Sequence, residues 1–218
     1  MVDTIELREQ MIHAALELKY YRLISLCGGN VSVRLDDGNF LITPSGMEYD
    51  NMKPEDICKV NKEGTVIEGK WRASSDTAAI IHIFENMPEV NAVIHTHQPY
   101  ATAISLVEDV FPPCCVTQVD ALRGKVNVAP FTISGDKGMG PLTCEYMEGS
   151  FAVILKNHGV MAVGVDLKKC LYAAVYLEEA AKTYCIARAM SNPVVPMSAA
   201  ETKAEAKDIS RWMNYHQG

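Results

Sequence analysis

Three of the six histidines lie where they could bind one metal ion. His95 and His97 are two residues apart in a segment that we expect to be a strand, and the two-residue repeat of a strand points both rings to one face. His158 lies in an Asn-His-Gly turn after another expected strand, and it could come close if the two strands approach in one sheet. Three neutral imidazoles with an open coordination position are typical of a catalytic zinc site. Either feature alone is weak evidence, because such pairs occur by chance and histidine is common in turns.

Three loops of small polar residues could bind an anion. They are Gly28-Gly29-Asn30 followed by Ser32, Thr43-Pro44-Ser45-Gly46, and Ser74-Ser75 ahead of an expected helix. Free backbone N–H groups and hydroxyls of this kind can surround a phosphate. Each loop also has an ordinary structural interpretation, as a turn for the first two and as a helix N-cap for the serine pair. The residues alone leave both alternatives open.

The composition is that of a globular protein without nucleic acid or membrane partners. The 218 residues are 48% hydrophobic and 22% charged, and the net charge of −7 opposes binding to phosphodiester backbones and anionic lipid surfaces. No apolar run approaches the roughly 18 residues needed to cross a bilayer, and the first residues lack the pattern of a signal peptide. We therefore expect a cytoplasmic protein.

The seven cysteines include no C-x-x-C pair, so the sequence predicts neither a disulfide framework nor a thiolate zinc site. The adjacent Cys114 and Cys115 stand in no recognised pattern with a histidine or an acidic residue. A cysteine nucleophile is therefore disfavoured.

The elements that must position the histidines and the polar loops alternate between helix and strand. Hydrophobic periodicity and capping residues predict helices at about 4–23, 53–60, 76–86, 99–107, 166–190 and 199–213. Short apolar or alternating runs predict strands at 31–35, 40–42, 92–94, 151–155 and 160–163. No repeat or linker divides the chain, so residues 1–218 are expected to form a single layered α/β domain.

Five motifs, taken in order and spacing, give the sequence a family resemblance. They are GGNVSVR at 28–34, LITPSG at 41–46, SSD at 74–76, HTH at 95–97 and NHG at 157–159. Together they resemble the class II aldolase/adducin family, over nearly the whole chain. The resemblance implies a single α/β/α domain with a mixed, largely antiparallel central sheet. It also implies a homotetramer with active sites between subunits.

The resemblance assigns roles to the histidines and to the polar loops. His95, His97 and His158 would be the ligands of Zn2+, with Mn2+ or Co2+ as alternatives because imidazole accepts all three. The adducin-type members lack these histidines, so an enzyme is favoured over an interaction protein. The substrate phosphate would be held by Asn30, Ser45, Gly46, Ser74 and Ser75, with Gly28 and Thr43 as weaker candidates.

The implied activity is that of a metal-dependent class II aldolase, a lyase of sugar-phosphate metabolism. It would cleave a ketose phosphate similar to L-fuculose 1-phosphate by a reversible retro-aldol reaction through a zinc-stabilised enediolate. By the same resemblance Asp76, Asp120 and Tyr215 would be the catalytic residues, with Asp76 as the acid/base beside the metal.

The sequence does not decide between two subfamilies, whose enzymes share the retro-aldol half-reaction. Thr43 and the segment 128–131 resemble the aldolases, whereas Asp76 and Asp120 resemble the L-ribulose-5-phosphate 4-epimerases of pentose catabolism. A decarboxylase is a weaker third alternative, because the members compared carry Lys where Asp76 stands. The sequence does not identify the sugar.

Overall fold

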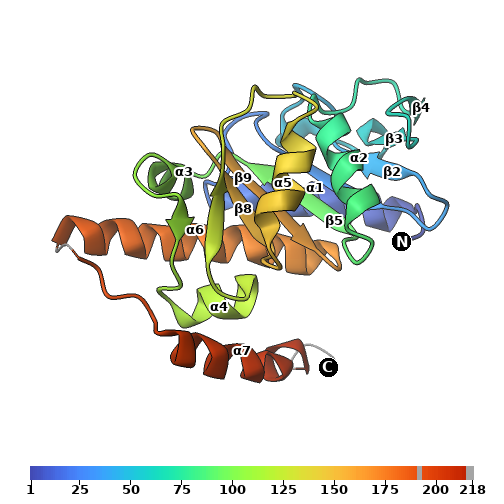
Figure 1. Cartoon of the computed structure of the whole chain (residues 1–218). Helices are drawn as coiled ribbons and strands as arrows, with labels where there is room; N and C mark the ends of the chain where they lie inside the picture. Colours follow the sequence, from blue (N-terminus) through green and yellow to red (C-terminus); the bar gives the residue numbers. More distant parts are fainter. Residues whose placement is uncertain (191–192, 215–218) are drawn as a thin grey trace.

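The computed structural model describes residues 1–190 and 193–214, and in these ranges nine strands form one open sheet (Figure 1). The strand order is β4-β3-β2-β1-β5-β9-β8-β7-β6. The strands are β1 (Asn30–Arg34), β2 (Phe40–Ile42), β3 (Cys58–Val60), β4 (Val66–Glu68), β5 (Ala92–Thr96), β6 (Val110–Phe111), β7 (Val126–Ala129), β8 (Ala152–Leu155) and β9 (Gly159–Gly164). Only the pair β7–β8 among them is parallel. The expected mixed, largely antiparallel sheet is confirmed.

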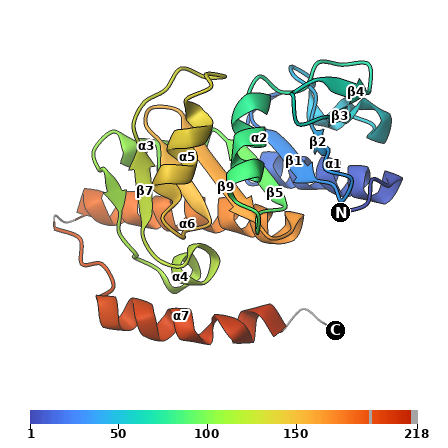
Figure 2. The same ribbon diagram turned by 45° about the vertical axis from the view of Figure 1, so that its right-hand side comes forward.

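Helices cover both faces of this sheet (Figure 2). They are α1 (Ile5–Tyr20), α2 (Thr77–Asn86), α3 (Pro99–Ser105), α4 (Val116–Leu122), α5 (Met139–Met147), α6 (Leu167–Met190) and α7 (Ala199–Asn214). Helices α1, α3 and α6 share one hydrophobic core with the sheet, and α2 and α5 share the other. Helix α4 packs on α6, and α7 packs on α4. The layered α/β/α arrangement is therefore as expected.

The strand alternation decides which face of the sheet each side chain reaches. In β5, Ala92 and Ile94 belong to the core under α1 and α6, whereas Val93 belongs to the core under α2 and α5. The two-residue repeat therefore places the side chain of His95 on the same face as Val93. Because β5 lies between β1 and β9 in the middle of the sheet, this histidine is carried by a strand paired on both sides.

Two helix starts follow the capping residues that the sequence offers. The Oγ1 atom of Thr4 accepts a hydrogen bond from Leu7 N at 3.1 Å, which satisfies one free N–H at the beginning of α1. At the beginning of α6, the Oδ1 atom of Asp166 accepts a hydrogen bond from Lys169 N at 2.7 Å. Both helices then bury an apolar face against the sheet.

The prediction of a helix at 53–60 is wrong. The chain makes one 3-10 turn at Pro54–Asp56 and then the strand β3, which pairs with β2 in the register Phe40↔Val60. Cys58 and Val60 thereby enter the core under α2, so burial in the sheet outweighs the local helical tendency. Helices α4 and α5 and strands β4, β6 and β7 were not expected, because each is too short to show a clear periodicity.

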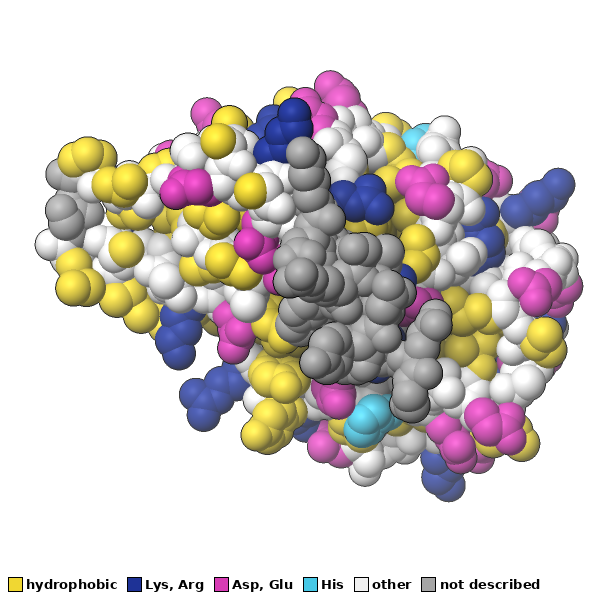
Figure 3. Space-filling model, turned by 90° about the horizontal axis from the view of Figure 1, so that it is seen from below, with side chains coloured by type: hydrophobic (Ala, Val, Ile, Leu, Met, Phe, Trp, Pro, Cys, Tyr) yellow, Lys and Arg dark blue, Asp and Glu magenta, His cyan; other side chains and the backbone are white. Residues whose placement is uncertain are grey.

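Apolar side chains remain exposed where α6 ends. Ile186, Met190 and Val195 are 50%, 81% and 89% exposed. Figure 3 shows hydrophobic side chains gathered at this end of the molecule. All seven cysteines are free thiols, and among the described helices none has the length and apolar character needed to span a membrane.

Candidate active site

His95 is oriented by the backbone of the neighbouring strand. It is 1% exposed, and its Nδ1 donates to Val160 O on β9 at 2.9 Å. Because a carbonyl oxygen only accepts hydrogen bonds, the proton is on Nδ1 and the Nε2 atom keeps its lone pair. This Nε2 lies 3.2 Å from the Nε2 of His97.

The turn between β8 and β9 brings the third histidine to the same place. One ring nitrogen from each of His95, His97 and His158 lies within 4.8 Å of the others. The turn can come this close because its next residue is Gly159, where a Cβ atom would lie only 2.0 Å from Thr96 O. The proximity expected for His158 is thus found, and the triad could hold a metal ion.

The distances and the protonation of the triad fit a metal such as zinc. A tetrahedral ion with Zn–N bonds of about 2.0 to 2.1 Å separates its nitrogen ligands by roughly 3.3 Å, close to the observed spacing of His95 and His97. Burial lowers the pKa of His95 to about 4, and burial also lowers the pKa of His97 and of His158. All three imidazoles are therefore neutral near pH 7, as ligation requires.

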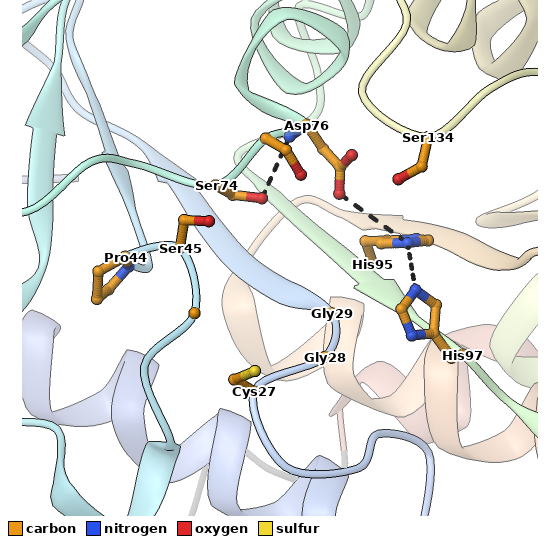
Figure 4. A pocket seen from close by; sticks show the side chains of 12 residues that line it. Cys27, Gly28, Gly29, Pro44, Ser45, Ser74, Asp76, His95, His97 and Ser134 are labelled. Carbon is orange, nitrogen blue, oxygen red and sulfur yellow. Dashed lines mark hydrogen bonds and ion pairs between the residues drawn. The ribbon is translucent and has the colours of Figure 1, made fainter.

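A pocket joins the histidines to the polar loops (Figure 4). Its wall is formed by Cys27, Gly28, Gly29, Pro44, Ser45, Gly46, Ser74, Ser75, Asp76, His95, His97 and Ser134. The loops that carry Ser45 and Ser74 are tied together by their backbones, because Ser45 N donates to Arg72 O and Ser74 N donates to Thr43 O. Five of the seven expected phosphate-binding residues therefore line one pocket with Asp76 and two of the histidines.

Asp76 lies between the serines and the histidines. It is 4% exposed at the start of α2, and its Oδ2 lies 4.0 Å from the Nε2 of His95. The same oxygen accepts a hydrogen bond from Asn30 Nδ2 at 2.8 Å. The Oδ1 atom is buried and has no hydrogen-bond partner among the described residues. A carboxylate beside a candidate metal centre can exchange a proton with a bound molecule.

The other two expected phosphate ligands, Asn30 and Thr43, do not belong to the pocket wall as the described residues form it. The Thr43 side chain is fully buried, and its Oγ1 accepts a hydrogen bond from Val31 N at 3.2 Å. Asn30 is buried behind Ser74 and Asp76, to which its amide is hydrogen-bonded. Both residues lie behind the pocket wall, and their hydrogen bonds connect the segments around it.

The two remaining catalytic candidates are Asp120 and Tyr215. Asp120 is half-buried on α4, which packs against α6 and α7, and it is absent from the pocket wall in the part of the chain described. Tyr215 lies outside the described residues. Their catalytic roles stay predictions.

Two residues of the pocket wall, Cys27 and Ser134, lie outside the loops that the sequence singled out, whereas Gly29 and Pro44 lie within those loops but were given no role of their own. Cys27 directly precedes the first loop. Ser134 comes from the loop after β7, and its only signal is a serine before a glycine. Figure 4 shows Ser134 across the pocket from Ser45 and Ser74, near Asp76 and His95.

The chain belongs to the class II aldolase family, since residues 9–185 match the model described as the class II aldolase and adducin N-terminal domain. A solved L-fuculose 1-phosphate aldolase is 27% identical, with a TM-score of 0.89 over 96% of this chain and 98% of the other.

Two further solved structures are similar to the chain. The L-fuculose-1-phosphate aldolase of Thermus thermophilus is 27% identical, with a TM-score of 0.75 over 88% of this chain and 98% of its own. YgbL of Escherichia coli, described by the three terms aldolase, epimerase and decarboxylase, is also 27% identical, with a TM-score of 0.82 over 92% of this chain and 98% of its own.

Proposed function

We propose that this protein is a metal-dependent aldolase that reversibly cleaves a ketose phosphate similar to L-fuculose 1-phosphate. The observation that carries the proposal is the pocket in which the histidines and Asp76 meet the loops of Ser45 and Ser74. One end of this pocket suits a metal ion, and the other suits a phosphate. The similarity to L-fuculose 1-phosphate aldolases supports the same substrate class.

His95, His97 and His158 would hold the metal, with Zn2+ as the first choice and Mn2+ or Co2+ as alternatives. Bound there, the metal supplies a Lewis acid that polarises the substrate carbonyl and stabilises the negative charge formed when the carbon–carbon bond breaks. His95 and Asp76 are buried and would shield this charge from bulk water, which strengthens its electrostatic stabilisation.

Asp76 is the proposed acid/base. In the cleavage direction its carboxylate takes the proton of the C4 hydroxyl, the C3–C4 bond breaks, and C4 leaves as an aldehyde. The electron pair of the broken bond remains on the C2–C3 fragment, which becomes dihydroxyacetone phosphate when a proton is returned to C3. Tyr215 stays the proposed second proton donor, at a position outside the described residues.

Ser45, Gly46, Ser74 and Ser75 are the proposed phosphate site, with Gly28 beside them. The two serines at 74 and 75 directly precede Asp76, the N-cap of α2, which is a helix of ten residues. The positive end of a helix dipole favours a bound anion at this position. With its phosphate here, the sugar would reach across the pocket toward Asp76 and the histidines.

The test is to incubate the metal-loaded protein separately with L-fuculose 1-phosphate and with L-ribulose 5-phosphate. We expect dihydroxyacetone phosphate from the first and no D-xylulose 5-phosphate from the second. Metal-stripped protein is the matched control and should form neither product. Failure to convert either sugar phosphate would overturn the proposal.

An epimerase with the same retro-aldol half-reaction is the second candidate. It is favoured by the aspartate at position 76 and by the similarity to YgbL, whose description includes epimerase. For an aldolase, Asp120→Asn should cost well under tenfold in kcat, whereas Asp76→Asn should cost about a hundredfold or more. A comparable loss at Asp120, with no triose phosphate from either sugar phosphate, would favour the epimerase.

A further inference from the structure

Tyr49 contacts the glycine loop of the pocket from the side of the protein core. Its side chain is 2% exposed and packs in the core that α1 and α6 share with the sheet, outside the pocket wall as the described residues form it. The Oη atom lies 2.9 Å from Gly29 O and 3.3 Å from Gly28 O. Gly28 and Gly29 both line the pocket (Figure 4), so one buried phenol is hydrogen-bonded to two residues of its wall.

The phenol of Tyr49 is a hydrogen-bond donor at neutral pH. Burial raises the pKa of Tyr49 to about 12, and the Thr43 side chain acts in the opposite direction with a smaller effect. The proton therefore stays on the phenol oxygen, and the carbonyl oxygens can only accept it. Because a phenol has a single hydrogen, the nearer acceptor Gly29 O receives the stronger bond, and Gly28 O lies at the edge of the same interaction.

The direction of these carbonyl groups determines where the N–H group between them points. In a trans peptide the C=O bond and the following N–H bond point in opposite directions. Because Gly28 O faces Tyr49, the N–H of Gly29 is directed away from Tyr49. This N–H has no hydrogen-bond partner in residues 1–190 and 193–214. Since the two glycines line the pocket and Tyr49 does not, the Gly29 N–H is a free donor on the pocket side of the loop.

The two glycines would allow this orientation to be lost. Gly29 has a φ of +71°, and a residue without a Cβ atom adopts positive and negative φ almost equally readily. The peptide between Gly28 and Gly29 could therefore turn over and present Gly28 O to the pocket. A carbonyl oxygen there would repel a phosphate oxygen, because both are acceptors with negative charge density. The hydrogen bonds from Tyr49 oppose this rotation.

We propose that Tyr49 is a positioning residue for the phosphate end of the pocket, which keeps the carbonyl oxygens of Gly28 and Gly29 on the core side and leaves the Gly29 N–H free for an anion. The inference rests on the proposed function, because it assumes a phosphate between the glycine loop and the loops of Ser45 and Ser74. It differs from a general structural role, since it predicts a change in anion affinity and none in metal content.

The first test is a titration of the zinc-loaded protein with inorganic phosphate, using Tyr49→Phe. This variant removes one oxygen atom and keeps the aromatic ring in the core. It should weaken phosphate binding roughly fivefold to tenfold, because the peptide is no longer held, and it should leave the zinc content unchanged. A phosphate affinity equal to that of the wild type would overturn the inference, and so would a parallel loss of zinc.

Kinetics with L-fuculose 1-phosphate distinguish binding of the phosphate from the chemical step. Tyr49→Phe should raise KM by a factor similar to the loss of phosphate affinity and change kcat less than about twofold. A fall in kcat with unchanged KM would contradict the role assigned to Tyr49. If the wild type cleaves neither sugar phosphate, the proposed function fails, while the phosphate titration still decides how Tyr49 acts.

A further measurement observes the Gly29 N–H itself. Gly28-Gly29 is the only pair of adjacent glycines in the sequence. In protein labelled with glycine that carries carbon-13 in its carbonyl group and nitrogen-15, Gly29 is therefore the only residue whose labelled nitrogen is bonded to a labelled carbonyl carbon. Its NMR signal should shift when phosphate is added to the wild type, and much less at the same phosphate concentration in Tyr49→Phe. A wild-type signal that does not respond to saturating phosphate, or an equal response in both proteins, would overturn the inference.

Tyr184→Phe is the matched control for the loss of a buried phenol oxygen. Tyr184 is 6% exposed on α6, and its Oη donates to Glu108 Oε1 at 2.8 Å, outside the pocket wall that the described residues form. This variant should lower the melting temperature but leave the phosphate affinity, KM and the Gly29 signal unchanged. Equal losses of phosphate affinity in both variants would show an effect of general stability and would contradict the positioning role of Tyr49.

Discussion

His95 is neutral and oriented without any help from a bound metal. Its Nδ1 proton is donated to Val160 O, and burial lowers its pKa to about 4, so its Nε2 lone pair is available at neutral pH. A ligand whose second nitrogen is anchored in this way loses little freedom when it binds a metal. The residue would therefore contribute to the affinity for a metal through its surroundings as well as through its ring.

Replacing His95, His97 or His158 with Ala should abolish turnover and release most of the metal, because two imidazoles hold an ion only weakly. Elemental analysis of each purified variant measures the metal content. His13→Ala is the control, since His13 lies on α1 with 75% of its side chain exposed. A variant lacking all three histidines that kept stoichiometric metal and full activity would show that the metal lies elsewhere.

Ser75→Asp should raise KM for the phosphorylated substrate at least tenfold and leave the metal content intact. The new carboxylate would repel the substrate dianion at a helix start that otherwise attracts it. Steady-state kinetics measure the change, and Ser75→Asn, which adds the same bulk without the charge, should raise KM much less. An unaltered KM in the aspartate variant would remove Ser75 from the phosphate site.

The histidine triad depends on how the turn between β8 and β9 packs against the end of β5. Gly159 makes this contact, and a Cβ atom there would lie 2.0 Å from Thr96 O and 3.1 Å from His97 Cα. Gly29 approaches the other side, where a Cβ would lie 2.4 Å from His95 O. The end of β5, with His95 in the strand and His97 just after it, is thus enclosed by backbone on both sides, at distances that only glycine allows.

Gly159→Ala should destabilise the fold by about 3 kcal/mol, because the added methyl group must push the turn away from β5. His158 would move with the turn, so the affinity for Zn2+ should fall as well. Chemical denaturation and a chelator competition measure the two effects. Gly138→Ala is the control, because Gly138 has a φ of −70° and a Cβ there would meet only the side-chain oxygen of Asp136; an equal loss in both variants would contradict the packing argument.

At the scale of the molecule, one arginine ties the beginning of the chain to the far edge of the sheet. Arg8 on α1 donates to both carboxylate oxygens of Asp3 at 2.8 and 2.9 Å, and to Glu68 on the edge strand β4 at 2.6 Å. It is 7% exposed and also reaches the carbonyl oxygen of Ile57. A bidentate, largely buried contact of this kind contributes more than an ordinary surface ion pair.

Stability should therefore fall in acid through Asp3. The hydrogen bonds from Arg8 lower the pKa of Asp3 in the folded state below its ordinary value of 3.8. The carboxylate thus stabilises the fold above that value, and this contribution is lost as the pH falls through the folded-state pKa.

Asp3→Asn should reduce the free energy of unfolding by about 1 kcal/mol at pH 7 and by much less near pH 2. Urea denaturation at both pH values measures this. Glu9→Gln, on the exposed face of the same helix, should change neither value. A loss for Asp3→Asn that is the same at both pH values would contradict the explanation.

The oligomeric state is also a property of the whole molecule. Phe131 and Ile133, in the loop that carries Ser134, are 62% and 71% exposed. Exposed apolar side chains beside a pocket are compatible with the proposed homotetramer, in which a neighbouring subunit would cover them. Sedimentation of the purified protein tests this expectation, and the cytoplasmic location stays an expectation as well.

Much of the fold was predictable because long helices and central strands carry their own signals. The strand expected at 40–42 and the helix expected at 199–213 agree with β2 and α7 to within one residue. Other short elements, among them β3, were not predicted. Residues 58–60 form a strand because they pair with β2, a partner about 18 residues away, and not because of their own propensity.

The sequence by itself determined which chemical groups the protein has and on which elements they lie. Side-chain type and local periodicity are properties of the chain, so the histidine pair on a strand, the Asn-His-Gly turn and the serines before a helix could all be recognised in it. The tertiary structure decided which of these groups lie together. Asn30 is an example, because its side chain is committed to Ser74 and Asp76, 44 and 46 residues further along the chain, and hydrogen bonds between such distant residues exist only once the strands and helices have packed.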